Sequence, residues 1–170
     1  MHRVLGKPLV TIERTTNMPL IRKILTDERV FGKMADDFAP PREQYEPLEH
    51  PEMIYLAVNG KQGIFALIPH SRIMYEIHTC LHPEIWGAQA LEAAASLLAW
   101  VWANTICERL ITSVPQHNRT ALRFAQKAGL EIYGTNPRAF MKNGRLENIV
   151  MLGISRPIQE RACDVRPCVA

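Results

Sequence analysis

The sequence predicts one α/β domain, in which helices flank a mixed, mostly antiparallel central sheet of six to seven strands. Short apolar runs suited to strands are interleaved with helix-like segments. Three of these runs follow one another closely, as antiparallel strands do, and a later strand-helix-strand crossover predicts a parallel pair. The 170 residues, 47% of them hydrophobic, are enough for one core.

The chain opens with a predicted strand and helix. Pro8 to Arg14 alternates weakly and carries β-branched residues, which favours a strand. Thr16 or Asn17 then provides a helix N-cap, and Pro19 falls in the first turn, where proline is tolerated. From Ala39 to Pro51, prolines and acidic residues indicate a surface connection with at most a short helical turn.

Three consecutive antiparallel strands follow. Met53 to Val58 and Gly63 to Ile68 are apolar runs that flank Asn59-Gly60. Asn-Gly between apolar runs is a strong hairpin signal, because both turn residues must accept a positive φ. Arg72 to Leu81 predicts the third strand.

The second half predicts two helices around one strand. The pattern turns helical after Pro83 and continues to Ala103, and Leu110 to Val114 is a short apolar run that predicts a strand. A second helix is expected from Arg119 to Lys127. It ends before Gly129, which accepts the left-handed conformation that often closes a helix.

Two final strands complete the predicted sheet. They are Leu130 to Tyr133 and Ile149 to Ile154, and an excursion with Asn143-Gly144 at its tip links them. We therefore expect one folded domain over residues 1–155 and a loosely ordered tail over residues 156–170.

Charge and apolar patterning exclude some classes of function. The 20 basic and 17 acidic residues are interspersed, without the Lys/Arg face of a nucleic-acid-binding protein. The most apolar stretch, Ala88 to Ala103, contains Glu92 and is shorter than the roughly 20 residues that cross a bilayer. We expect neither membrane insertion nor nucleic-acid binding.

The cysteines and the N-terminus predict a cytoplasmic protein without a metal. The beginning of the chain, Met1 to Pro8, lacks the apolar run of a signal peptide, so reduced thiols are expected. The four cysteines show neither a C-x-x-C pair nor zinc-ligand spacing. They are Cys80, Cys107, Cys163 and Cys168.

The segment from Glu76 to Gly87 ends a predicted strand and opens a helix. Unpaired backbone N–H groups at a helix start bind anions well, and Gly87 allows a ligand to approach the backbone. Many strand-to-helix turns contain a glycine, so this feature alone is also explained by ordinary structure.

The segment resembles the GNAT superfamily of N-acetyltransferases, and most closely the branch that acetylates N-terminal alanines of ribosomal proteins. That branch has a pattern like E-I-G-Y-x-L-x-P-E-Y-W-G-K-G, followed by N-x-x-S-x-x-x-x-x-K-x-G-F. The short, degenerate motifs also resemble GNAT-like proteins encoded by bacteriophages. The matching residues are Glu76, Ile77, Leu81, Pro83, Glu84, Trp86 and Gly87 in the first motif, and Asn118, Lys127 and Gly129 in the second.

The resemblance implies a single-domain GNAT fold that uses acetyl-coenzyme A as acyl donor. Backbone amides at the helix start would hold the coenzyme A pyrophosphate, neighbouring strand residues would pair along the pantetheine arm, and Asn118 would lie near that arm. Asn118 is equally well explained as an ordinary N-cap. The implied pyrophosphate residues are Gly87, Ala88, Gln89 and Ala90, and the implied arm residues are Cys80, Leu81 and His82.

Ala121 and Leu130 replace the serine and the phenylalanine of the second motif, and two further departures from the family bear on catalysis. Gln89 stands where the second glycine of the phosphate loop is usual, and a side chain there changes how closely a pyrophosphate approaches. Ala125 occupies the position where many GNAT enzymes carry the tyrosine that protonates the leaving thiolate.

An amine must lose a proton to attack a thioester, so a base is expected near the cleft. Glu76 and His78 are two apart on one strand and share a face, which makes them the leading catalytic candidates, Glu76 first. The alternative is that Glu76 bonds a neighbouring strand and His78 is an ordinary core histidine. His82, His117 and Tyr133 are weaker candidates, and an acyl-enzyme on Cys80 is disfavoured because no base partner is recognisable.

The predicted function is therefore direct acetyl transfer from acetyl-coenzyme A to a primary amine: a protein N-terminus, a lysine or a small amine. A GNAT-fold protein that binds coenzyme A or a protein partner without catalysis is the alternative, consistent with Gln89 and Ala125. A structural or nucleic-acid-associated accessory role is a third reading. The sequence leaves the acceptor open, and it leaves the oligomeric state open, a homodimer included.

Overall fold

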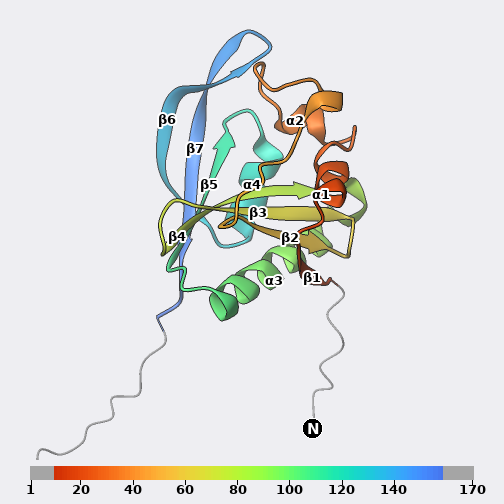
Figure 1. Cartoon of the computed structure of the whole chain (residues 1–170). Coiled ribbons are helices and arrows are strands. Elements are labelled where there is room, and N and C mark those ends of the chain that lie inside the picture. The colour runs from red at the N-terminus through yellow and green to blue at the C-terminus, as the bar shows by residue number, and fades with distance from the viewer. Residues whose placement is uncertain (1–9, 159–170) are drawn as a thin grey trace, which may run out of the picture.

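The computed structural model describes residues 10–158, which form a single mixed sheet with helices on both faces (Figure 1). The strand order is β1-β2-β3-β4-β5-β7-β6. The predicted fold class is confirmed, with seven strands over these residues. The strands are β1 (Ile12–Thr15), β2 (Ile54–Val58), β3 (Gly63–Pro69), β4 (Met74–Leu81), β5 (Arg109–Pro115), β6 (Glu131–Lys142) and β7 (Arg145–Ser155).

Four α-helices and two 3-10 turns connect the described strands. The first helix begins as predicted, because the Asn17 side chain accepts a hydrogen bond from the Leu20 N–H (3.1 Å) and Pro19 lies in the first turn. The helices are α1 (Met18–Leu25), α2 (Phe31–Met34), α3 (Ala88–Asn104) and α4 (Arg119–Lys127); the 3-10 turns are η1 (Arg42–Gln44) and η2 (Pro83–Ile85).

The two faces of the sheet have separate cores. On one face, α3 packs Ala93, Leu97 and Val101 against Phe65 and Ile77, all buried. Phe124 of α4 packs partly buried against this same cluster. We call it the α3 face.

On the opposite face, α1 packs Ile21 and Ile24 against Ile64, Ala66 and Cys80. These side chains alternate along β3 and β4 with those of the α3 face, as the two-residue period of a strand requires. We call this the α1 face.

The crossover through α3 makes β4 and β5 the one parallel pair among the described strands, and their pairing is short. Only Met74, Tyr75 and Glu76 of β4 have partners on β5. Beyond Glu76, β5 continues beside β7, while β4 continues beside β3. The two strands therefore separate, and a gap opens within the sheet.

Several elements differ from the sequence prediction. The excursion expected between the last two strands is itself paired: β6 and β7 run on to Lys142 and Arg145, with irregular register between Asn136 and Phe140. Polar, exposed strands of this kind carry no apolar pattern, which explains the difference. Helix α2 was not predicted. The helix expected after Pro83 is divided into η2 and α3 at Trp86-Gly87.

The residue at the start of the predicted tail is part of the folded unit. The Arg156 guanidinium donates hydrogen bonds to the backbone oxygens of Trp102 (2.9 Å), Thr105 (2.7 Å) and Cys107 (2.9 Å). These bonds join the end of β7 to the end of α3. The rest of the predicted tail, from residue 159, lies outside the described residues, as do Cys163, Cys168 and the Met1 to Pro8 segment.

No helix within residues 10–158 is long and apolar enough to cross a membrane. The same residues hold no group of three or more His, Cys, Asp or Glu side chains that could bind a metal ion.

Candidate functional site

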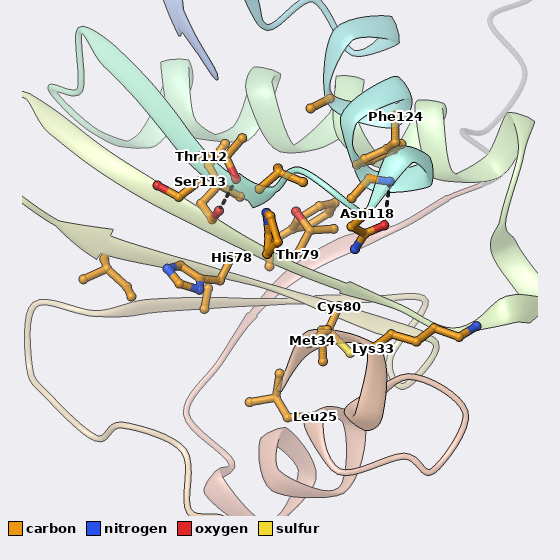
Figure 2. A pocket seen from close by; sticks show the side chains of 18 of the residues that line it. Leu25, Lys33, Met34, His78, Thr79, Cys80, Thr112, Ser113, Asn118 and Phe124 are labelled. Atoms are coloured by element: carbon orange, nitrogen blue, oxygen red, sulfur yellow. Dashed lines mark hydrogen bonds between the residues drawn. The ribbon is translucent and has the colours of Figure 1, made fainter. Parts of the chain in front are cut away.

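A cleft of about 530 Å³ occupies the gap where β4 and β5 separate (Figure 2). One wall is β4, with His78, Thr79 and Cys80, and the other is β5 from Thr112 to Pro115 together with the start of α4. The cleft is lined from both faces of the sheet. The α3-face lining includes Ile77, Ala94, Leu97, Leu98 and Phe124; the α1-face lining includes Leu25, Phe31, Met34, Tyr45 and Tyr55.

The register of the sheet decides which backbone groups face this cleft. The His82 N–H donates to the Gln62 oxygen (2.9 Å), so His82 and Gln62 form a hydrogen-bonded pair. Hydrogen-bonded and non-hydrogen-bonded pairs alternate in an antiparallel ladder. The backbone groups of Cys80 and His82 therefore point at β3, and those of Thr79 and Leu81 point into the gap.

Two side chains bond to this open edge of β4. The Thr112 hydroxyl donates to the Ile77 oxygen (2.9 Å), and the Trp86 indole N–H donates to the Leu81 oxygen (2.8 Å). Thr79 lies between these two positions and faces the gap with both backbone groups. An extended chain with amide groups could pair with this edge as an added strand would.

The helix start next to the cleft requires a glycine. Gly87 has φ +87 and ψ −128, a backbone conformation that side-chain-bearing residues rarely adopt. It caps α3 without a side-chain hydrogen bond, and the first turn of α3 contains no acidic residue. Gly87, Ala88 and Gln89 are exposed, while Ala90 is buried against the core. The amides of this turn thus face solvent at the positive end of a helix of 17 residues.

Asn118 has the N-cap geometry that the sequence allowed. Its Oδ1 accepts from the Ala121 N–H (3.1 Å), and the residue also lines the cleft. Ala125, about two turns beyond Asn118 on α4, is buried, lines the cleft and supplies no titratable group where a tyrosine is usual.

The two leading catalytic candidates lie side by side on β4, but only one lines the cleft. His78 lines it, and 58% of its side chain is exposed. Glu76 lies outside the lining and is more buried; its Oε2 accepts from His70 Nε2 (2.9 Å), and its Oε1 is 3.8 Å from His78 Nε2. The carboxylate therefore sits between two imidazoles, and His70 on the neighbouring loop is a member that the sequence did not indicate.

Cys80 and His82 direct their side chains at the end of α1. Burial raises the pKa of the Cys80 thiol to about 12, so the group is protonated at neutral pH. The His82 ring is buried and donates from Nε2 to the Ile24 oxygen (3.1 Å). Nearby, bonds from Arg29 hold the pKa of Asp27 below its usual range. These contacts join α1 to the strand end.

The remaining histidine and tyrosine candidates lie away from β4. His117 pairs with Glu147 on β7 and stacks loosely on Phe140, with ring centroids 5.9 Å apart. Tyr133 is half exposed on β6, with the Arg109 guanidinium 5.4 Å from its ring centre. Neither lines the main cleft among the described residues.

The tip of the β6–β7 hairpin is fastened to the α2 segment at the rim of the cleft. The Asp37 carboxylate accepts from the N–H groups of Asn143 (2.8 Å) and Gly144 (2.7 Å). Lys142 Nζ donates to the backbone oxygens of Gly32 (2.8 Å) and Ala35. We call this set of bonds, residues 32–37 with 142–144, the clasp; Figure 1 shows the hairpin tip beside α2.

The sequence did not single out several residues of the cleft. Thr79 lacks any signal because its importance comes from the register of β3. Lys33, which lies over the Trp86 ring (4.8 Å to the centroid), and Asp36 belong to a segment without a clear secondary-structure pattern. Trp86, which the first motif does include, is 47% exposed and lies directly before Gly87, outside the cleft lining.

Comparison with known proteins identifies the fold. No protein-family model and no curated protein matches the sequence. Among solved structures, a spermidine N-acetyltransferase from Vibrio cholerae in complex with coenzyme A and spermine aligns with TM-score 0.68 and 16% identity, over 88% of this chain and 96% of that one. A GNAT-family acetyltransferase from Streptococcus pneumoniae aligns with TM-score 0.64 and 18% identity, over 86% and 98%. The chain therefore has the GNAT fold.

Proposed function

We propose that this GNAT-fold chain is an N-acetyltransferase that moves an acetyl group from acetyl-coenzyme A to a primary amine by direct attack. The observation that carries the proposal is the gap between β4 and β5, in which the backbone edge at Thr79 and Leu81 faces a cleft beside the uncapped start of α3. A fold alone does not fix an activity. The proposal rests on the open edge of β4, which borders the cleft at Thr79, being joined to the start of α3 by the bond from the Trp86 indole to the Leu81 oxygen (2.8 Å).

The residues present fit coenzyme A. Acetyl-coenzyme A supplies a thioester, whose acetyl carbon accepts the amine and whose sulfur leaves as a thiol. The amides of Gly87, Ala88, Gln89 and Ala90 would hold the pyrophosphate, aided by the helix dipole. The exposed Gln89 side chain points to a looser approach than a second glycine would allow.

The pantetheine arm carries two amides that would pair with the open edge of β4. Leu81 keeps the role that the resemblance implied, and Thr79 takes the place of Cys80 and His82, whose backbones face β3. Asn118 lines the same cleft and has amide hydrogens to offer the arm, since its Oδ1 is occupied by the helix cap.

His78 is our preferred general base, with Glu76 as the group that positions it. His78 lines the cleft, and Glu76 stands behind it with a carboxylate oxygen 3.8 Å from Nε2. A carboxylate at that place favours the imidazolium formed when His78 accepts the amine proton. The proton could then leave through Glu76 and His70, which is 41% exposed on its side chain.

Protonation of the leaving thiolate needs a different donor from that of many GNAT enzymes. Ala125 has no proton to give, so we assign this role to solvent entering the cleft or to the Tyr45 phenol that lines it. Burial raises the Tyr45 pKa, which keeps that phenol protonated at neutral pH. The Thr79 N–H, directed into the gap, is placed to stabilise negative charge on the carbonyl oxygen.

The ribosomal-protein branch and a bacteriophage source rest on the motifs alone. A cytoplasmic location rests on the cysteines and the N-terminal segment, and a homodimer stays open. A second function, binding of coenzyme A or a protein partner without catalysis, is favoured by one specific observation. Ala125 leaves α4 without a titratable group in the cleft. Turnover with a panel of primary amines separates the two functions.

Calorimetric titration with acetyl-coenzyme A tests the proposal. We expect micromolar binding to the unaltered protein and none to Gly87→Glu, because a carboxylate there blocks the phosphate site sterically and by charge repulsion. Gly60→Glu is the matched control. Gly60 also has a positive φ (+73) and open space around it, but it lies in the β2–β3 turn. A folded wild-type protein without binding, or a Gly87→Glu variant that still binds, would refute the proposal.

A further inference from the structure

We infer that the acceptor is a small primary amine with a single positive charge on an apolar, aromatic body, an arylalkylamine, and not a polyamine. This inference rests on the proposed acetyl transfer and adds the substrate class. It is carried by the side chains on the α1 face of the cleft.

The cleft has two halves, and the α1-face half is free for an acceptor. The phosphate site and Asn118 belong to α3 and α4, and the arm would enter the gap along β4 from there. The thioester would then emerge near His78, whose side chain, like those of Glu76 and Cys80, projects to the α1 face. We call this half, which lies between residues 31–45 and His78, the acceptor half.

The acceptor half is apolar and rich in aromatic rings. Phe31 and Tyr45 meet edge to face, with ring centroids 5.5 Å apart. Tyr55 is buried, and its hydroxyl hydrogen is already donated to the Leu48 oxygen (2.6 Å). Met34 adds a thioether that packs well against aromatic rings. Phe140 and Ile68 also line the cleft.

The charges of the cleft do not suit a polyamine. Within residues 10–158, the lining contains one carboxylate, Asp36, and one ammonium, Lys33. A polyamine brings three or four ammonium groups, and burying these among apolar side chains beside a single carboxylate is costly. One ammonium can pair with Asp36 or approach the aromatic faces as a cation. The structurally similar Vibrio cholerae enzyme was solved with spermine. We therefore expect the two proteins to differ in the class of amine that they bind.

The clasp fits the same occupant. By bonding the hairpin tip to residues 32–37, it holds Phe140 and the α2 side chains on one side of the acceptor half. The volume of about 530 Å³ is shared with the pantetheine arm, and apolar pockets in this range typically hold one small ligand. A small aromatic amine fills the remaining space better than a peptide N-terminus.

Two measurements on the full chain test the inference. The first is binding of phenethylamine, butylamine, spermidine and a short peptide with an N-terminal alanine, observed by saturation-transfer NMR without coenzyme and with coenzyme A. The second is thiol release from acetyl-coenzyme A with the same four amines. We expect phenethylamine to bind most tightly, and to exceed spermidine at least tenfold in kcat/KM.

The variant Met34→Glu sharpens the test, with Met34→Gln as its uncharged match. Met34 is 38% exposed, so both variants should fold. A carboxylate in the acceptor half should improve spermidine binding about fivefold and weaken that of phenethylamine, because one partly solvated ion pair has about this effect. Met34→Gln should leave spermidine binding as weak as in the unaltered protein.

The outcomes separate the two proposals. If spermidine or the peptide is preferred in both measurements, the proposed acceptor class is wrong and the proposed acetyl transfer still stands. If acetyl-coenzyme A binds but no amine binds and none is acetylated, the proposed acceptor class is also wrong. Failure of acetyl-coenzyme A to bind refutes the proposed function itself, whereas phenethylamine binding without coenzyme would still support the apolar acceptor half.

Discussion

Two hairpins of this protein share the dipeptide Asn-Gly at the turn and differ in nearly everything else. Asn59-Gly60 and Asn143-Gly144 all have positive φ, between 48 and 73 degrees. The first dipeptide belongs to a four-residue connection between Val58 and Gly63, whereas the second joins Lys142 directly to Arg145. The strands of the first hairpin are almost entirely buried, whereas in the second β6 is largely exposed and β7 is largely half-buried.

The difference shows that turn chemistry does not decide what a hairpin is for. Asn59 donates to Gln62 within its own turn (2.7 Å) and accepts from the N–H of Thr11 (2.9 Å), so it joins the turn to the chain just before β1 in the core sheet. Asn143 and Gly144 bond to Asp37, more than 100 residues away, and close the rim of the cleft. The buried hairpin should therefore govern stability and the clasped hairpin should govern the acceptor.

The largest predicted effect is on stability, from the same substitution in each hairpin. Leu67→Ala in β3, where Leu67 is fully buried, should lower the free energy of unfolding by about 2 to 5 kcal/mol through lost burial and a cavity. Leu146→Ala in β7, where the side chain is 46% exposed, should cost less than about 1 kcal/mol. Urea unfolding measures both. Equal losses would contradict the division of roles.

The second prediction concerns acceptor binding and not stability. Asp37→Ala removes both carboxylate bonds of the clasp and should raise the KM for the amine several-fold, leaving the affinity for acetyl-coenzyme A unchanged. Asn59→Ala, its counterpart in the buried hairpin, should cost about 1 kcal/mol of stability and leave that KM unchanged. An unchanged KM in Asp37→Ala would show that the clasp does not shape the acceptor half.

A third prediction uses pH to loosen the clasp. The N–H groups of Gly144 and Asn143 hold the pKa of Asp37 below its usual range. Because the pKa of Asp37 is lower in the folded state, its bonds stabilise the fold fully at pH values above the unfolded pKa of about 4. The stabilisation is lost as the pH falls through the folded pKa. The amide shift of Gly144 should titrate with a midpoint below the usual pKa of an aspartate. The Gly60 amide, in the other Asn-Gly turn, serves as the reference.

The smallest predicted effect concerns Cys80, which belongs to the buried region. With its pKa raised to about 12, the thiol should react with iodoacetamide far more slowly in the folded protein than in urea at neutral pH. Peptide mass spectrometry reads this directly. Cys80→Ala should retain acetyl transfer, since direct attack needs no acyl-enzyme; loss of turnover in a folded variant would restore that mechanism.

The sequence predicted most of the fold because the informative patterns are local. Asn17 and Asn118 cap α1 and α4 as their positions suggested, and the apolar runs form β2, β3 and β5. The exposed parts of β6 and β7 were not predicted as strands, since strands without a buried face have no periodic pattern of apolar residues. Helix α2, of four residues, is too short to carry one.

By itself, the sequence determined the order of elements, the turns and the glycine at the start of α3, because each depends on residues close in the chain. Only the tertiary structure decided that the backbone of Thr79 faces the gap while those of Cys80 and His82 face β3, that His70 lies against Glu76, and that Asp37 holds a turn in the last hairpin. These are matters of register and of contacts between distant segments. They are fixed when the helices pack on the two faces of the sheet, since a shift of one residue in strand pairing would turn every side chain of that strand to the other face.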